Sequence, residues 1–271
     1  MQTRGPSADA LVALRDRLDT TLAEVGARKA AQVGDELFSL AVLVRTTPSL
    51  RRVLTDVSVD GAAKASLVRQ LFADKVDDHT LDLVADAVAR RWTSTRDLAD
   101  TIEHLSEVAV VRSAGDDVER VVDELFTVSR TVDGDPELRG ALSDPARSLD
   151  DKGGLVDGLL AGKALAATVT LVKHALASGY RSVGVALEEY QKVAAAIRNE
   201  SVARVRVARE LTVADRTRLE AALSRQYGRN VHLNVVVEPG LLGGMRVEIG
   251  DDVIDGTVDA RLDEARRKLV G

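Results

Sequence analysis

The chain has 271 residues, no cysteine, 3% aromatic residues and a formal net charge of -6 from 43 acidic and 37 basic side chains. The lack of cysteine excludes a disulfide framework and cysteine-ligated zinc or iron–sulfur sites, and the interleaved charges form no basic patch for nucleic acid. The 45% of hydrophobic residues, mainly Ala, Leu and Val, favour packed helices. The length allows one large or two ordinary domains, of which two are expected, and the sequence predicts a reduced, cytoplasmic protein without a signal peptide or a membrane span.

Apolar residues recur at helical spacing through the first part of the chain. The pattern predicts helices over 8–25 and 30–44, a short helix that starts at Pro48, a helix from the Asp60 cap to Phe72, and helices over about 80–92 and 94–114. Gly115 is the obvious break before the next helical segment, 116–131. Glycine inside a helix costs roughly 1 kcal/mol relative to alanine, so the two segments are either rigidly joined or hinged.

The helical region contains an internal repeat with an offset of 88 residues. Residues 33–94 align with residues 121–182 without a gap, and 23 of the 62 pairs are identical. The identities include Asp-Glu-Leu-Phe at 35–38 and Pro-x-Leu-Arg at 48–51. Solenoid repeats have periods of roughly 20 to 50 residues, so each copy is expected to be a whole helical bundle.

A different pattern begins near residue 200 and predicts a small α+β module. Apolar and polar residues alternate in short runs that favour strands, and an amphipathic run between the first two favours a helix. The predicted order is a strand at 200–207, a helix from the Thr212-x-x-Asp215 capping box to Gly228, a strand at 231–237, a hairpin of 245–249 and 252–254 around Gly250-Asp251, and a helix from the Thr257 cap to about Leu269. Gly243 and Gly244 are expected to allow a close approach of a neighbouring backbone or a bulge.

Together these elements predict a mainly α chain in three parts. Two tandem related helical bundles occupy 1–112 and 113–199, and the small α+β module occupies 200–271. The boundaries follow the repeat offset and the change of pattern near residue 200.

Three groups of residues invite a chemical interpretation, and each has a simpler structural one. Gly162-Lys163 resembles part of a phosphate-binding loop, but the glycine spacing and the following Ser or Thr are missing. A calcium loop needs carboxylates at alternate positions, and this spacing is not met by Asp251, Asp252 and Asp255. The four histidines are scattered along the sequence and do not have the spacing of a zinc site. We therefore predict no catalytic residue, no cofactor and no metal; a nucleotide-using enzyme built around Gly162-Lys163 is the catalytic alternative.

The segment from Leu241 to Leu262 carries the most information about function. It resembles the C-terminal signature of the delta subunit of F-type ATP synthases, a family called the oligomycin-sensitivity-conferring protein in mitochondria. The residues that carry the resemblance are Gly243, Gly244, Gly250, Asp251, Asp255, Gly256, Thr257 and Leu262. Members of this family usually have one six-helix bundle before the signature, whereas this sequence predicts two.

The resemblance implies a non-catalytic stator subunit of the peripheral stalk. Such a subunit links the b-type stalk subunits of the membrane sector to the α/β catalytic head at the cytoplasmic face of the plasma membrane, and meets the membrane only through the complex. In the family, an N-terminal segment of an α subunit docks against the first and fifth bundle helices. The corresponding candidates are Leu11, Leu14, Leu18, Leu83, Val84 and Ala87, or, in the second copy, Leu171, Val172 and Ala175. The alternative is an unrelated cytoplasmic helical adaptor.

Overall fold

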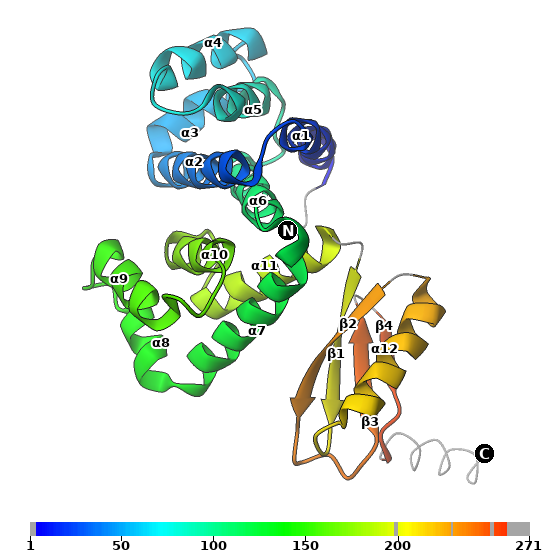
Figure 1. The fold of residues 1–271 in the computed structure, drawn as a ribbon. Helices are drawn as coiled ribbons and strands as arrows, with labels where there is room; N and C mark the ends of the chain where they lie inside the picture. The colour runs from blue at the N-terminus through cyan, green and yellow to red at the C-terminus, as the bar shows by residue number, and fades with distance from the viewer. Residues whose placement is uncertain (1–3, 198–199, 229, 250–251, 259–271) are drawn as a thin grey trace, which may run out of the picture. The chain divides into compact units, whose positions relative to one another are not determined.

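The chain forms two compact units, Met1–Ala194 and Ala195–Gly271. The computed structural model describes residues 4–197, 200–228, 230–249 and 252–258. The first unit is built of helices, and the second combines a helix with a four-stranded sheet (Figure 1). This confirms the predicted mainly α fold with a small α+β module at its C-terminal end.

Six helices make up the first part of the helical unit, and the local signals in the sequence explain their ends. They are α1 (Pro6–Ala23), α2 (Ala27–Thr46), α3 (Pro48–Thr55), α4 (Gly61–Phe72), α5 (Asp78–Ala89) and α6 (Asp97–Arg112). Asp60 caps α4, because its Oδ2 accepts from the backbone N of Ala62 at 3.0 Å. The helix α5 is shorter than predicted: it ends at Ala89, and the Trp92 indole donates back to the carbonyl of Ala87 at 3.1 Å.

Gly115 lies in a break between two helices, α6 and α7, and not inside one continuous helix. The helix α6 ends at Arg112, a short 3-10 helix spans Gly115–Asp117, and α7 begins at Val118. Gly115 adopts a φ of 57°, a left-handed conformation that glycine reaches without the penalty of a Cβ atom. The two predicted helical segments are therefore separate helices joined by a tight turn.

The 88-residue repeat of the sequence is also present in the secondary structure, because helices recur at the same offset. The helices α7 (Val118–Gly134), α8 (Pro136–Ser143), α9 (Leu149–Leu160), α10 (Ala166–Ala177) and α11 (Val183–Ile197) follow in the order of α2 to α6. Those from α8 to α10 begin and end 88 residues after α3 to α5. Adding 88 to the bounds of α1 gives 94–111, which overlaps α6 at 97–112. We therefore call α1–α6 the first copy and α6–α11 the second copy, with α6 common to both.

A half-buried glutamate takes the same role in each copy. In the first, Glu36 Oε2 on α2 accepts from the Thr80 hydroxyl at 2.6 Å and from the backbone N of Asp77 at 2.8 Å. In the second, Glu124 Oε2 on α7 accepts from the Thr168 hydroxyl at 2.6 Å and from the backbone N of Leu165 at 2.9 Å. A carboxylate at the N-terminus of a helix is stabilised by free N–H groups and the helix dipole. The repeated Asp-Glu-Leu-Phe sequence is thus explained partly by this bond.

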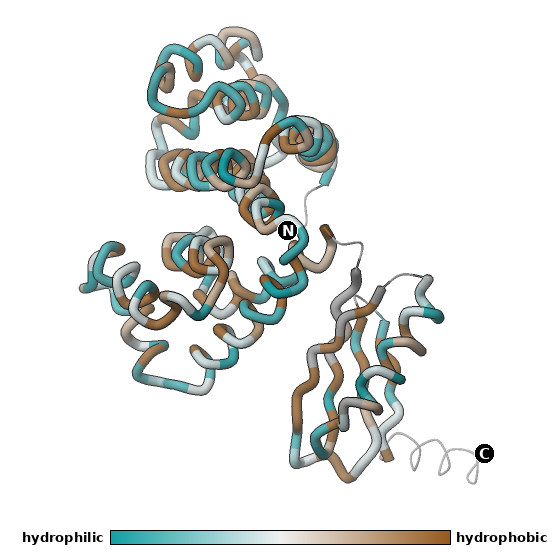
Figure 2. Tube along the Cα trace, viewed as in Figure 1, coloured by the Kyte–Doolittle hydropathy of each residue, from teal (hydrophilic) through white to brown (hydrophobic). Residues whose placement is uncertain are grey.

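The second unit is a sheet with the strand order β2-β1-β3-β4. The strand β1 (Glu200–Val207) pairs in parallel with β2 (Asn230–Val237) and antiparallel with β3 (Met245–Ile249), which pairs antiparallel with β4 (Asp252–Asp255). The helix α12 (Val213–Tyr227) connects β1 to β2, capped by the Thr212 hydroxyl and ended by Gly228 at a φ of 65°. Figure 2 shows the apolar positions, in brown, along the strands.

The core of this unit lies between α12 and one face of the sheet. Its buried members are Ala203, Val205, Val207, Leu223, Val231, Leu233, Val247 and Ile249. The predicted hairpin is present, because Ile249 pairs with Asp252. The turn residues Gly250 and Asp251, the predicted final helix and the signature residue Leu262 lie outside the described residues.

Candidate functional site

The residues predicted to bind a partner lie mostly inside the helical unit. Leu11 on α1 is partly exposed, and its neighbour Val12 is 62% exposed. The other eight candidates are buried: Leu14, Leu18, Leu83, Val84 and Ala87 in the first copy, and Leu171, Val172 and Ala175 in the second. These eight side chains pack the helices against one another, and the sequence pattern that selected them is the ordinary pattern of a helical core.

In the second copy, the first and fifth helices are α6 and α10, and α2 of the first copy packs against both. The ring of Phe38 on α2 stacks on His174 of α10 with centroids 3.9 Å apart and planes at 4°. His174 Nε2 also lies 3.1 Å from a carboxylate oxygen of Asp35. The chain itself therefore covers part of the surface on which a partner helix could dock in the second copy.

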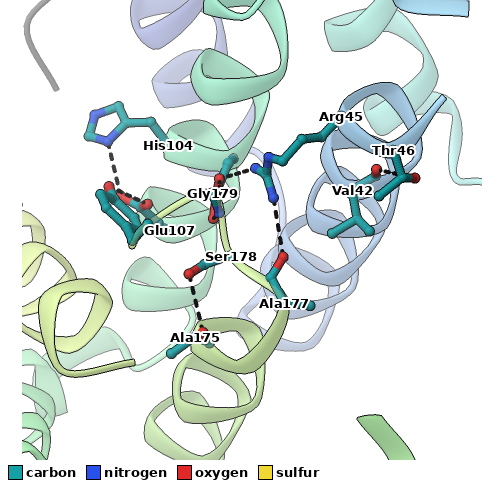
Figure 3. A network of polar contacts seen from close by, with 11 residues as sticks. Val42, Arg45, Thr46, His104, Glu107, Ala175, Ala177, Ser178 and Gly179 are labelled. Atoms are coloured by element: carbon teal, nitrogen blue, oxygen red, sulfur yellow. Dashed lines mark hydrogen bonds and ion pairs between the residues drawn. The ribbon is translucent and has the colours of Figure 1, made fainter. Parts of the chain in front are cut away.

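A buried polar cluster ties the two copies together (Figure 3). Glu103 on α6, only 3% exposed, accepts from the Arg45 guanidinium of α2 and from the backbone N of Gly179 at 3.0 and 3.1 Å. Arg45 Nη1 also donates to the carbonyl of Ala177 at 3.1 Å, at the end of α10. We call Arg45, Glu103, Ala177 and Gly179 the junction. It connects one helix from each copy to the helix that they share.

The environment of the junction favours the neutral form of Glu103. Burial raises the pKa of its carboxyl to about 7, with smaller contributions from Glu107 and Asp100, while Arg45 and the Gly179 N–H act in the opposite direction. Glu107, on the same face of α6, accepts from the Tyr180 hydroxyl at 3.0 Å. Burial also raises the pKa of the Tyr180 phenol, so this hydroxyl stays protonated and can donate. Buried polar pairs of this kind favour one specific geometry but cost desolvation.

The second copy has an apolar groove between α7, α8, α9 and α10 with a volume of about 400 Å³. It is lined by Val128, Val132, Leu138, Leu142, Val156, Leu159, Leu160, Ala164 and Val172, with Asp123, Glu124, Thr127, Thr131 and Lys163 as its polar members. At the positions of Val128, Leu160 and Ala164, the first copy carries Leu40, Phe72 and Val76. The two copies thus differ in side-chain size at three positions of the groove lining.

The signature residues of the second unit shape a close backbone crossing. Gly244 has a φ of 82°, and a Cβ atom there would lie 2.3 Å from the carbonyl oxygen of Gly256. Gly256 N donates to the carbonyl of Met245 at 2.9 Å, and Val258 N donates to that of Gly243 at 3.1 Å. The expected close approach at Gly243-Gly244 is confirmed.

The end of β4 is held by Asp255. Its Oδ1 accepts from the backbone N of Thr257 at 3.0 Å and from the Thr257 hydroxyl at 2.6 Å. These two bonds hold the pKa of the Asp255 carboxyl below its usual value. The carboxylate therefore has a structural role at the turn that follows β4.

The Gly162-Lys163 pair has a structural role at the end of α9. Gly162, with a φ of 70°, follows the end of α9, and Lys163 Nζ donates to the carbonyl of Leu159 at 3.2 Å. The corresponding Lys75 donates to Leu71 at 2.9 Å. The pair lies in the short link between α9 and α10, and the Lys163 ammonium is bonded back to the end of α9. Within the described ranges, no acidic and histidine side chains gather in threes as a metal site, and no helix has the length and apolarity to cross a bilayer.

Comparison with known proteins agrees with the signature. The model of the ATP synthase delta (OSCP) subunit family matches residues 105–269, a range that starts within α6. ATP synthase subunit delta of Nocardioides sp. is 58% identical over 272 residues, covering 99% of this chain and 97% of that protein. The subunit of Kineococcus radiotolerans is 43% identical over 271 residues, and 98% of each chain is covered. These matches remove the alternative of an unrelated adaptor, and the chain belongs to the ATP synthase delta (OSCP) subunit family.

Proposed function

We propose that the chain is a non-catalytic stator subunit of a proton-translocating ATP synthase. It joins b-type stalk subunits to the α/β head at the cytoplasmic face of the plasma membrane and resists the torque of rotation. Membership of the delta subunit family supports this role. The structural observation that carries it is the junction, because Arg45, Glu103 and Gly179 brace the two copies against each other around α6.

A stator must transmit force without yielding, and the helical unit has features suited to that task. The helix α6 continues the core of one copy into the other, and almost all of its residues from Leu98 to Val111 are buried. Gly34 on α2 allows a close approach: a Cβ atom there would lie 2.5 Å from Val110 Cγ2 and 3.1 Å from its backbone N. Close-packed interiors have low compressibility and transmit strain. The duplication therefore lengthens the clamp without adding a free hinge at α6.

We further propose that an N-terminal segment of an α subunit docks against α1 and α5 of the first copy. The corresponding helices of the second copy, α6 and α10, pack against α2. On α1, which contacts α5, the partly exposed Leu11 and the exposed Val12 provide apolar surface, while Leu14 and Leu83 are buried. A partner helix with an apolar stripe fits such a surface through contacts at helical spacing.

Deletion of residues 1–93 is expected to separate the contribution of the first copy from that of the second. The deletion leaves α6 and Glu103 in place but removes Arg45 and α2, so circular dichroism must first show that the second copy stays folded. In cells that carry this truncated chain, we expect a loss of coupled ATP synthesis and of co-purification with α subunits. Truncation of α1 alone, residues 1–23, is the smaller companion variant. Unchanged synthesis and unchanged recovery of α and b-type subunits would show that the first copy is not part of the stator.

The substitution Leu11→Glu is expected to weaken the association with α subunits at least tenfold. A carboxylate on the proposed docking face must be desolvated when a partner helix covers it. Association is measured as retention of purified α subunits by the immobilised full-length chain. The matched control is Val57→Glu, at a 72% exposed position after α3. Equal retention by both variants would place the docking surface elsewhere, and thermal melting of each variant shows whether its fold is intact.

A further inference from the structure

A pocket of about 380 Å³ in the helical unit, mostly in the first copy, is lined mainly by charged side chains. Its lining consists of Arg45, Arg51, Arg96, Ala99, Asp100 and Gly179. The three arginines come from α2, from α3 and from the residue that precedes α6, so they approach the pocket from different elements. We call this the arginine pocket. It lies beside the junction and shares Arg45 and Gly179 with it.

Two of the three guanidinium groups are held in place by bonds within the chain. Arg45 bonds to Glu103 and to the carbonyl of Ala177, and Arg51 Nη1 donates to the carbonyl of Arg45 at 2.7 Å. Arg45 Nε is buried and has no hydrogen-bond partner within the described chain. Because these side chains are already ordered, a ligand would bind them at a lower entropic cost. A buried donor without a partner also favours an acceptor in the pocket.

The charges of the pocket do not cancel. Arg45 is bonded to Glu103, and Arg51 and Arg96 share the pocket with the single carboxyl of Asp100. Burial raises the pKa of the Asp100 carboxyl, although Arg45 and Arg96 act in the opposite direction. Like charges confined in a half-enclosed space repel one another, and an anion between them relieves the repulsion. This electropositive spot stands out in a chain with a formal net charge of -6.

The second copy provides an internal comparison at the positions 88 residues later. Arg51 corresponds to Arg139, which makes the same bond: its Nη1 donates to the carbonyl of Asp133 at 2.9 Å. At the other positions the second copy has Asp133 for Arg45, Gly184 for Arg96 and Glu188 for Asp100. The bond to a backbone carbonyl thus accounts for one arginine in each copy. The junction accounts for Arg45, and neither explanation covers Arg96.

We propose that the arginine pocket binds a phosphate-class oxyanion. A tetrahedral oxyanion offers acceptor oxygens in several directions, which suits donors that arrive from three elements, whereas a planar carboxylate is matched best by one bidentate arginine. Free inorganic phosphate and the phosphate groups of a nucleotide share this chemistry. A bound oxyanion would bridge α2, α3 and the start of α6. Binding of this kind is independent of the stator role.

Titration of the purified full-length chain with inorganic phosphate tests the site. Calorimetry is carried out at constant ionic strength maintained with sodium chloride, since non-specific attraction is screened by salt. We expect saturable binding of one phosphate per chain, and binding at least tenfold weaker in Arg51→Gln/Arg96→Gln. Arg45 stays unchanged because it is part of the junction. Arg96→Gln alone, at an exposed side chain, should also weaken binding without affecting thermal melting.

Arg139→Gln is the matched control, because it removes the same backbone bond as Arg51→Gln but lies in the second copy. It should bind phosphate as the unmodified chain does. Parallel titrations with ADP distinguish the two sources: tighter binding of ADP than of inorganic phosphate indicates a nucleotide, and the reverse indicates the free anion. The proposal is overturned if phosphate does not bind above the chloride background, if the double variant binds it equally well, or if acetate binds as tightly.

Discussion

Replacement of Arg45 with methionine is expected to lower the free energy of unfolding of the helical unit by about 3 kcal/mol at pH 8, and by much less at pH 5. Methionine keeps the apolar stem but removes the cation. The carboxylate of Glu103, 3% exposed, is then left with the Gly179 N–H and no positive partner. At pH 5 this carboxyl is already protonated, because burial raises its pKa to about 7. Urea unfolding followed by circular dichroism at both pH values measures the difference.

Glu103→Gln tests the same explanation from the other partner. The pKa of Glu103 rises from the usual 4.5 to about 7 on folding. Between pH 4.5 and pH 7, the Glu103 carboxyl is therefore protonated to a larger extent in the folded chain than in the unfolded chain. The stability from this group is complete below about pH 4.5 and is lost as the pH rises through 7. The glutamine variant should lack this loss. Arg52→Met, at an exposed position on α3, is the control for Arg45→Met. A loss of stability for Arg45→Met that is equal at pH 5 and pH 8 would contradict the role of the buried charge.

Gly244→Ala is expected to destabilise the α+β module by about 3 kcal/mol. The alanine Cβ would meet the carbonyl oxygen of Gly256 at 2.3 Å and Thr257 Cα at 2.9 Å, and both belong to the backbone. The φ of 82° adds strain for any residue with a side chain. Neither neighbour can rotate away, so the hydrogen bonds between the start of β3 and residues 256–258 must shift.

Hydrogen exchange of the full-length chain resolves this effect by region. Amides of β3 and β4 should exchange faster in Gly244→Ala, while those of α6 should not change. Gly240→Ala is the control, because a Cβ atom at Gly240 meets nothing within 4 Å. Equal exchange in the two variants would show that the signature glycine is not required for the backbone crossing.

Local features of the fold could be predicted from the sequence, because short-range patterns encode them. Apolar residues at helical spacing, the Asp60 and Thr212 caps and Pro48 predicted the helices of the first copy, α7 and α12 to within a few residues. Alternation and the Gly250-Asp251 pair predicted the hairpin of β3 and β4. The 88-residue repeat and the C-terminal signature identified the duplication and the family, since both consist of residue identities that can be compared directly.

The tertiary structure alone decided which apolar residues are core and how the copies join. Helical periodicity selects one face of a helix but does not show whether that face meets the chain itself or a partner, and eight of the nine candidates proved to be buried. Glu103 meets Arg45 across 58 positions and Gly179 across 76, and Arg45 meets Ala177 across 132. No pattern of spacing links residues so far apart, because their contact depends on the packing of three helices. The sequence by itself thus determined the elements, the repeat and the family, and only packing determined the junction, the groove and the arginine pocket.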